Sequence, residues 1–153
     1  MQQATFGMGC FWGPQHYFKQ VPGVVETAVG YMGGYTTNPT YKDVCSGSTG
    51  HAEVVHIRFD ETKTSYAALL REFFSHHNPT QVNRQGPDVG DQYRSVIFYH
   101  TPTQQSQATH ALKQAQDEYD TPIATKLQEA KTFYRAEEYH QDYLASNQHA
   151  CSF

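Results

Sequence analysis

Apolar and polar residues alternate with two periodicities along the chain, which together predict interleaved strands and helices. A two-residue period over 51–59 is typical of a half-buried strand. Leucines and phenylalanines at helical spacing over 65–77 predict an amphipathic helix that Ser65 can cap. The predicted strands are 5–8, 24–31, 51–59 and 94–99, and the predicted helices are 15–20, 65–77, 103–119 and 136–147. The segment 123–131 is ambiguous between strand and helix, and the preceding Pro122 favours a strand. Because no clean parallel repeat is present, the pattern favours an α+β fold.

Two long segments, 32–50 and 78–91, are rich in turn-forming residues and are predicted to be loops. Irregular segments of that length within a compact domain are usually functional. We therefore expect a single-domain two-layer α/β sandwich with a mixed sheet, a ferredoxin-like core and long functional loops. The length suits one domain over 1–153, and residues 148–153 are expected to form a mobile C-terminal tail.

Charge and composition narrow the class of protein. The net charge is −4 and the Lys and Arg residues are scattered, so the chain lacks the basic patch of a nucleic-acid-binding protein. No apolar run approaches the roughly 18 residues of a membrane span, and residues 1–11 lack the basic and apolar regions of a signal peptide. We expect a cytoplasmic protein and, since no pattern indicates an obligate partner surface, a monomer.

The cysteine and histidine patterns argue against a disulfide framework and against a metal site. Cys10, Cys45 and Cys151 are odd in number and widely spaced, unlike the cysteines of small secreted domains. The nine histidines show no spacing typical of zinc ligands. We therefore expect reactive thiols, no metal and no bound cofactor.

Cys10 has the most informative surroundings. It lies between a predicted strand and a predicted helix, with glycines on either side that allow a sharp turn, and Pro14 suits the first turn of the helix. A helix N-terminus favours a thiolate. A lone cysteine is commonly just a small buried apolar residue. The only tryptophan of the chain, Trp12, stands two residues away, which favours a reactive site instead.

Several motifs, in order, resemble those of the A-type peptide methionine sulfoxide reductases. They are Gly9-Cys10-Phe11-Trp12-Gly13, Gly30-Tyr31-Met32-Gly33-Gly34, Asn38-Pro39-Thr40-Tyr41, Gly50-His51-Ala52-Glu53, Arg84-Gln85-Gly86-Pro87-Asp88 with Gln92-Tyr93-Arg94-Ser95, and Ala136-Glu137-Glu138-Tyr139-His140-Gln141-Asp142-Tyr143. The resemblance runs over residues 6–147. Any one motif could arise by chance, but the ordered set indicates the family.

The resemblance implies a role for each matching residue. Cys10 would be the catalytic thiol, Glu53 the acid, Tyr41 and Tyr93 the hydroxyl donors, Asp88 a support for the same oxygen-binding corner, and Phe11 and Trp12 the apolar pocket for the substrate methyl group. A buried neutral carboxyl can protonate the sulfoxide oxygen. The thiolate then attacks sulfur, methionine departs and a sulfenic acid remains. One enzyme exists per sulfoxide epimer, and the resemblance implies the S-epimer. Away from the motifs, Glu53 would read as a solvated strand residue and Asp88 as a turn cap.

The resemblance also implies that Cys151, in the tail, resolves the sulfenic acid by forming a disulfide. With no second tail cysteine, we expect thioredoxin, or dithiothreitol in vitro, to reduce Cys10–Cys151 directly. The partners would then be thioredoxin and oxidised proteins or peptides that carry methionine sulfoxide. Cys45 is expected to be a bystander. Gln15 stands where many relatives have Glu, and an effect on rate or pKa is expected.

Two other functions fit Cys10. A peroxidase or acyl-transfer enzyme would need a histidine base beside Cys10 and would not need Glu53. A binding module that grips native or oxidised methionine through Phe11 and Trp12 would bind without turnover, and Cys10→Ser would leave it intact. A thiol in the tail argues against the binding module.

Overall fold

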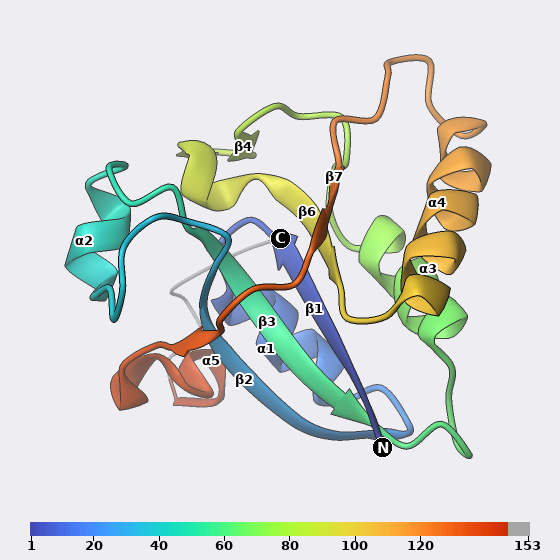
Figure 1. Cartoon of the computed structure of the whole chain (residues 1–153), viewed down its shortest axis with the longest axis horizontal. Coiled ribbons are helices and arrows are strands. Elements are labelled where there is room, and N and C mark those ends of the chain that lie inside the picture. The colour runs from blue at the N-terminus through green and yellow to red at the C-terminus, as the bar shows by residue number, and fades with distance from the viewer. Residues whose placement is uncertain (147–153) are drawn as a thin grey trace.

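A six-stranded mixed sheet forms the centre of the computed structural model, which describes residues 1–146 (Figure 1). The strands of this sheet are β1 (Gln2–Met8), β2 (Val24–Met32), β3 (Ala52–Phe59), β6 (Ser95–Tyr99), β7 (Lys126–Glu129) and β8 (Tyr134–Arg135). Their order is β7-β6-β1-β3-β2-β8, and only β6 and β7 run parallel. The predicted α+β fold with a mixed sheet is confirmed.

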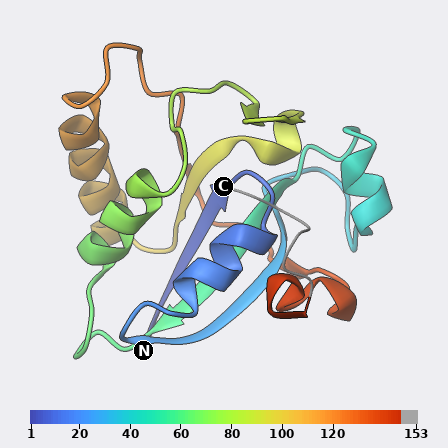
Figure 2. The same ribbon diagram turned by 180° about the vertical axis from the view of Figure 1, so that it is seen from behind.

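Helices cover one face of this sheet. The helices of the described residues are α1 (Trp12–Phe18), α2 (Tyr41–Cys45), α3 (Tyr66–Ser75), α4 (Pro102–Gln116) and α5 (Tyr143–Ser146), with two 3-10 turns, η1 (Asp91–Tyr93) and η2 (Glu138–His140), and α1, α3 and α4 form the covering layer. The chain order β1-α1-β2-β3-α3-β6 with the sheet order β6-β1-β3-β2 is that of a ferredoxin-like core. Figure 2 shows α1, α3 and α4 on the same side of the sheet, which gives the expected two layers.

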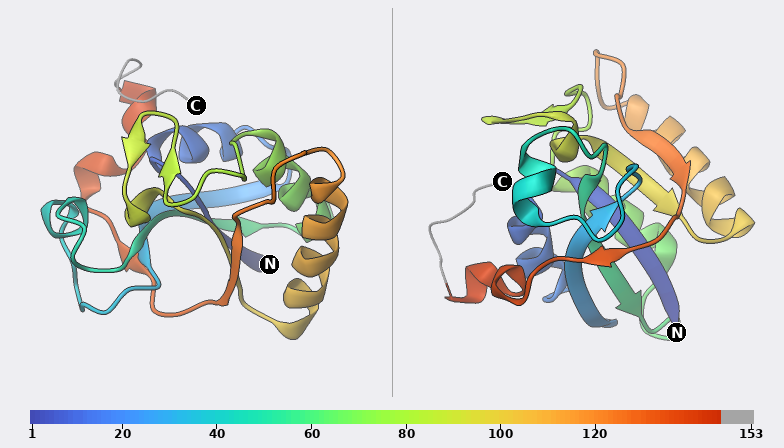
Figure 3. Two further views of the ribbon diagram at one scale, coloured as in Figure 1. Left: turned by 90° about the horizontal axis from the view of Figure 1, so that it is seen from above. Right: turned by 60° about the vertical axis from the view of Figure 1, so that its left-hand side comes forward.

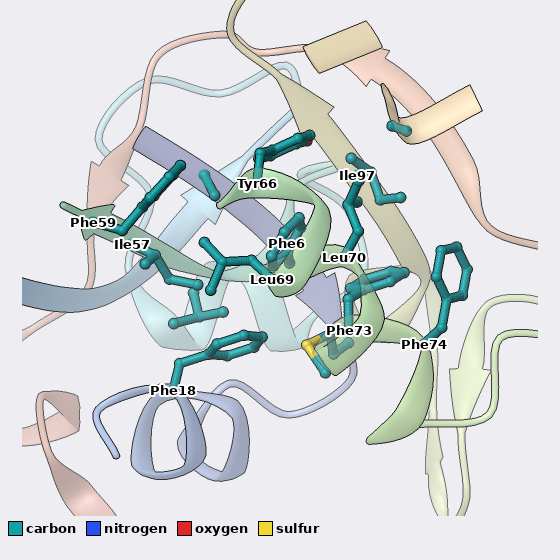
Figure 4. Close-up of a cluster of buried hydrophobic side chains, with 14 of the residues drawn as sticks. Phe6, Phe18, Ile57, Phe59, Tyr66, Leu69, Leu70, Phe73, Phe74 and Ile97 are labelled. Atoms are coloured by element: carbon teal, nitrogen blue, oxygen red, sulfur yellow. The ribbon is translucent and has the colours of Figure 1, made fainter. Parts of the chain in front are cut away.

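The main core lies between these helices and the sheet, and it fixes the position of α1 (Figure 4). Phe6 of β1 lies with its ring centroid 5.0 Å from that of Phe73 in α3 and 5.8 Å from that of Phe18 in α1. Burying a side chain of this size contributes about 1.5–3 kcal/mol. The same contacts therefore hold both ends of the turn between β1 and α1, where Cys10 lies.

The opposite face of the sheet is also covered, and this corrects the prediction of a half-buried strand over 51–59. Ala130 and Phe133, in the connection from β7 to β8, pack over a second cluster that contains Ala52 and Val54 of β3. On β3 only Arg58 is exposed. A covering segment without regular structure leaves no helical or strand period in the sequence, so the alternation alone could not reveal it.

The starts of α3 and α4 lie within one residue of the predicted positions, whereas other boundaries differ. Ser65 caps α3 by accepting a hydrogen bond from Ala68 N at 3.0 Å, as predicted. The predicted helix over 15–20 begins earlier, at Trp12. The predicted loop over 32–50 contains α2, and the loop over 78–91 contains a hairpin. The two strands of that hairpin are β4 (Arg84–Gln85) and β5 (Asp88–Val89).

The predicted helix over 136–147 is wrong. The segment consists instead of η2 and α5, separated by Asp142 in the left-handed region at φ 55°. Ahead of that residue, the side-chain amide of Gln141 accepts a hydrogen bond from Val29 N at 2.9 Å and donates one to Val29 O at 2.9 Å. These tertiary bonds to β2 replace the helical ones. The predicted tail, 148–153 with Cys151, lies outside the described residues.

No helix within residues 1–146 is both long enough and apolar enough to cross a membrane.

Two buried histidines make the stability of the fold dependent on pH. His56 of β3 lies with Nδ1 2.7 Å from Thr5 Oγ1, and burial lowers its pKa to about 4. His77 lies with its two ring nitrogens 2.7 Å from Phe73 O and 2.7 Å from Ser95 Oγ, and burial likewise lowers its pKa to about 4. Both imidazoles are therefore neutral in the folded protein at neutral pH.

The free energy of unfolding is expected to fall as the pH drops from about 6.5 to about 4. In that interval the unfolded chain binds protons that His56 and His77 exclude in the folded state, so stability is full above the unfolded pKa and is lost below it. Each histidine contributes about 3 kcal/mol to this decrease, so the two together should lower the free energy of unfolding by about 6 kcal/mol. Urea unfolding across this pH range measures it, and an unchanged free energy of unfolding would contradict the assignment.

Candidate active site

Cys10 lies in a tight turn between β1 and α1. β1 ends at Met8, and Phe11 is the N-cap residue of α1, so the thiol directly precedes the helix start. Gly9 adopts φ 96°, and a Cβ on it would lie 2.7 Å from Cβ of Gln85 in the β4–β5 hairpin. The hairpin therefore packs against the turn, and glycine is required there both for its backbone angle and for space.

Glu53 reaches this turn from the neighbouring strand. It is only 1% exposed and shares the helix-facing side of β3 with Val55. Its Oε1 accepts a hydrogen bond from the backbone N–H of Phe11 at 3.2 Å. The carboxyl group is therefore held next to the residue that follows Cys10, in surroundings that disfavour a charged group. It is not the solvated strand residue that an isolated strand pattern would suggest.

Two tyrosine hydroxyls approach the same carboxyl from separate loops. Tyr41 is the first residue of α2 and Tyr93 the last of η1. Burial, reinforced by the nearby carboxyl of Glu53, raises the pKa of each tyrosine well above its ordinary value. Both hydroxyls therefore keep their protons and can donate hydrogen bonds. Both views of Figure 3 show α2 and the β4–β5 hairpin at the same end of the molecule.

Asp88 and Cys45 complete this group. Asp88, on the β4–β5 hairpin, lies close enough to Tyr93 to help raise its pKa. The Cys45 thiol lies near the hydroxyls of Tyr41 and Tyr93 and, although the residue is exposed at the surface, partial desolvation raises its pKa. Cys45 was expected to be a bystander, but the structure places it beside the two tyrosines. The raised pKa disfavours the thiolate and hence nucleophilic attack by this residue.

A group of aromatic rings, the aromatic cup, adjoins the turn and includes Phe11 and Trp12. Phe11 is buried, and its ring centroid lies 6.3 Å from that of Tyr41. The half-buried ring of Trp12 stacks on Tyr143 at 4.1 Å, and its Nε1 donates a hydrogen bond to Nδ1 of His140 at 3.1 Å. These rings provide an apolar wall of the kind expected for a methyl group.

The described part of the chain thus brings together seven of the predicted site residues, from segments far apart in sequence. They are Cys10, Phe11, Trp12, Tyr41, Glu53, Asp88 and Tyr93. Cys151 lies outside the described residues. Within residues 1–146, no group of three or more His, Cys, Asp or Glu side chains could hold a metal ion.

Sequence reasoning left other contributors to the site without a role. Glu137 and Gln141 stand in a quoted motif, and both bind neighbouring backbone. Gln15 is buried and links Thr27 O at 3.4 Å to Asp142 N at 2.8 Å. One available signal was overlooked: Thr40 followed by Asp43 is the pattern of a capping box, which the structure shows at the start of α2. That helix would have placed Tyr41 and Cys45 on one face.

A turn-borne cysteine beside a buried carboxyl and two protonated tyrosines, on an α+β core, defines a thiol-dependent oxidoreductase as the class of protein. Comparison with known proteins then identifies the family. The family model described as peptide methionine sulfoxide reductase matches residues 2–153. The chain therefore belongs to the peptide methionine sulfoxide reductase family and is a thiol-dependent methionine sulfoxide reductase of the A type.

Individual relatives agree with that assignment. The peptide methionine sulfoxide reductase MsrA of Methanoculleus marisnigri is 57% identical over 148 residues, covering 95% of this chain and 90% of the relative. The MsrA of Geobacter sulfurreducens is 53% identical over 146 residues, covering 94% and 90%.

Among solved structures, reduced Mxr1 from Saccharomyces cerevisiae has a TM-score of 0.94 at 34% identity, covering 99% of this chain and 88% of that one. Methionine sulfoxide reductase A of Corynebacterium diphtheriae has a TM-score of 0.88 at 36% identity, covering 99% and 77%.

Gly9→Ala is expected to lower the free energy of unfolding by about 2 kcal/mol or more, because the added Cβ meets Gln85 and the backbone angle is strained. Turnover should fall with it, because the turn carries Cys10. Gly86→Ala is the matched control: Gly86 also has a positive φ, 57°, but nothing lies within 4 Å of its Cβ position. Its cost should be about 1 kcal/mol. Chemical denaturation and turnover compare the two, and equal losses would show that the hairpin does not constrain the turn.

Proposed function

We propose that Cys10, Glu53, Tyr41 and Tyr93 carry out the reduction of the S-epimer of methionine sulfoxide, free or within a peptide. The observation that supports this most directly is the buried Glu53 carboxyl, hydrogen-bonded to the amide next to Cys10. Because burial disfavours the charged form of a carboxyl group, Glu53 holds a proton that it can deliver to the sulfoxide oxygen.

Substrate binding follows from the two sides of the site. The aromatic cup of Phe11 and Trp12 takes the methyl group, and the tyrosine side takes the oxygen. Tyr41 and Tyr93, which keep their protons, donate hydrogen bonds to that oxygen, and Asp88 supports Tyr93. Hydrogen-bond donors arranged before the reaction stabilise charge as it develops on the oxygen.

The reaction then proceeds in two steps, reduction of the sulfoxide and formation of a disulfide. The Cys10 thiolate attacks the sulfur of the protonated sulfoxide, the oxygen passes to Cys10 as a hydroxyl group, and methionine leaves with its sulfur reduced. Cys10 is thereby oxidised to a sulfenic acid. The Cys151 thiol, in the tail of the same catalytic domain, next attacks the Cys10 sulfur. Water leaves and a Cys10–Cys151 disulfide forms.

A dithiol must return the enzyme to its reduced form, and we propose that thioredoxin reduces the Cys10–Cys151 disulfide. Yeast Mxr1, 25% identical to this chain at a TM-score of 0.66, has been solved in complex with Trx2. Oxidised proteins and peptides that carry methionine sulfoxide are the proposed substrates. A reducing compartment such as the cytoplasm would maintain such a thiol cycle.

Turnover of each epimer of a methionine sulfoxide peptide tests the proposal, with dithiothreitol and then thioredoxin as reductant. Cys10→Ser should abolish reduction of the S-epimer. Cys151→Ser should remain active with dithiothreitol, which can reduce the sulfenic acid itself, but should stall after one turnover with thioredoxin. Activity that survives in Cys10→Ser would contradict the role of Cys10, and unimpaired thioredoxin-driven turnover in Cys151→Ser would contradict the role of Cys151.

A further inference from the structure

The carboxylate of Glu137 links the segment that follows β8 to α2, the helix that carries Tyr41. Its Oε2 accepts a hydrogen bond from the backbone N–H of Tyr41 at 3.1 Å, and its Oε1 accepts one from the hydroxyl of Tyr31 at 3.2 Å. Glu137 does not belong to the group of residues that would contact the substrate. Its position relative to Tyr41 nevertheless gives it a way to act on the oxygen side of the site.

The main chain around Glu137 is fastened to β2 on both sides, so its carboxylate has a fixed position. Just before it, Ala136 N donates a hydrogen bond to Val29 O at 2.9 Å. Just after the η2 turn, the Gln141 amide accepts from Val29 N and donates to Val29 O, each at 2.9 Å. Tyr31, which binds the other carboxylate oxygen, is itself fully buried on β2.

The helix α2 depends on such outside contacts because it is only five residues long. A helix of this length is unstable by itself, and the N–H groups of its first turn have no partner within the helix. Glu137 supplies an acceptor for one of them, and a negative charge at a helix start is favourable. Burial raises the pKa of Glu137, but hydrogen bonds from backbone N–H groups and from Tyr31 outweigh it, so the net pKa lies below its ordinary value. The carboxylate therefore stays ionised at neutral pH.

We infer that Glu137 is a positioning residue, which holds the first turn of α2 so that the Tyr41 hydroxyl meets the sulfoxide oxygen beside Tyr93. The inference rests on the proposed function, because it concerns the donor role of Tyr41. A displacement of about 1 Å at a reacting group can cost on the order of a hundredfold in rate. Removal of Glu137 should therefore impair the chemistry without removing any group that touches the substrate.

A double-mutant cycle tests the inference through kcat and KM for the S-epimer peptide with dithiothreitol. Tyr41→Phe and Glu137→Ala should each lower kcat/KM about tenfold, with the loss chiefly in kcat. The double variant Glu137→Ala/Tyr41→Phe should lose about tenfold in total, since Glu137 acts through the Tyr41 hydroxyl. Independent effects would instead multiply to about a hundredfold, and that result would overturn the inference.

Two further variants separate positioning from general damage to the fold. Glu137→Gln retains an acceptor oxygen for Tyr41 N–H and should keep most of the wild-type kcat, even if Glu137→Ala folds poorly. A tenfold loss in a folded Glu137→Gln protein would overturn the inference. Glu138→Ala is the control, because the side chain of Glu138 is 83% exposed and, within residues 1–146, its one ion pair is with Arg135 at 3.4 Å. It should leave kcat and KM unchanged.

The outcome for Tyr41→Phe distinguishes the inference from the function on which it rests. Full activity in Tyr41→Phe would overturn both the donor role of Tyr41 and the positioning role of Glu137. It would not contradict the proposed role of the Cys10 thiol, because the Cys10→Ser variant tests that role separately.

Discussion

The hydrogen bond from the Phe11 amide to the buried Glu53 carboxyl is the contact on which the rest of the site depends. It joins the first turn of α1 to β3, beside the turn after β1 that carries Cys10. The antiparallel register of β1 and β3, in which Phe6 pairs with Val55, brings the end of β1 beside Glu53. The core around Phe6 and the hairpin packed on Gly9 leave this turn little freedom. Acid and thiol are thus placed by the sheet itself.

The remaining groups of the site are held less directly, by segments that lack regular structure or have little of it. Tyr41 stands on a five-residue helix whose start is bound by Glu137, and Trp12 is bound through its indole N–H by His140. Both partners come from the segment that follows β8, which is fastened to Val29 of β2. The segment that follows β8 therefore connects Trp12, on the side proposed to bind the methyl group, with Tyr41, on the side proposed to bind the sulfoxide oxygen.

The sequence predicted the elements whose partners are local and missed those decided by tertiary contacts. The Ser65 cap, the core face of α3 and the strand before Cys10 could all be predicted from spacing. The break of the last helix at Asp142 could not, because the amide of Gln141 bonds to β2 instead of to its own turn. Among the site residues, Cys10 stood out by its neighbours, whereas Glu53 and the tyrosines depended on the family motifs. The proximity of Cys45 to both tyrosines needed the unpredicted helix α2.

The claim that Glu53 delivers a proton within this buried site is tested most directly by a single-turnover measurement on Glu53→Gln. Glutamine keeps an oxygen that can accept the Phe11 N–H, but its amide is not an acid. The S-sulfoxide peptide is mixed with enzyme in the absence of reductant. The rate at which the peptide with reduced methionine forms then reports the chemical step alone. The account predicts a rate lower by about 10²–10⁴, with peptide affinity and free energy of unfolding close to those of the wild type. A folded Glu53→Gln protein that forms the reduced peptide at the wild-type rate would contradict this role of Glu53.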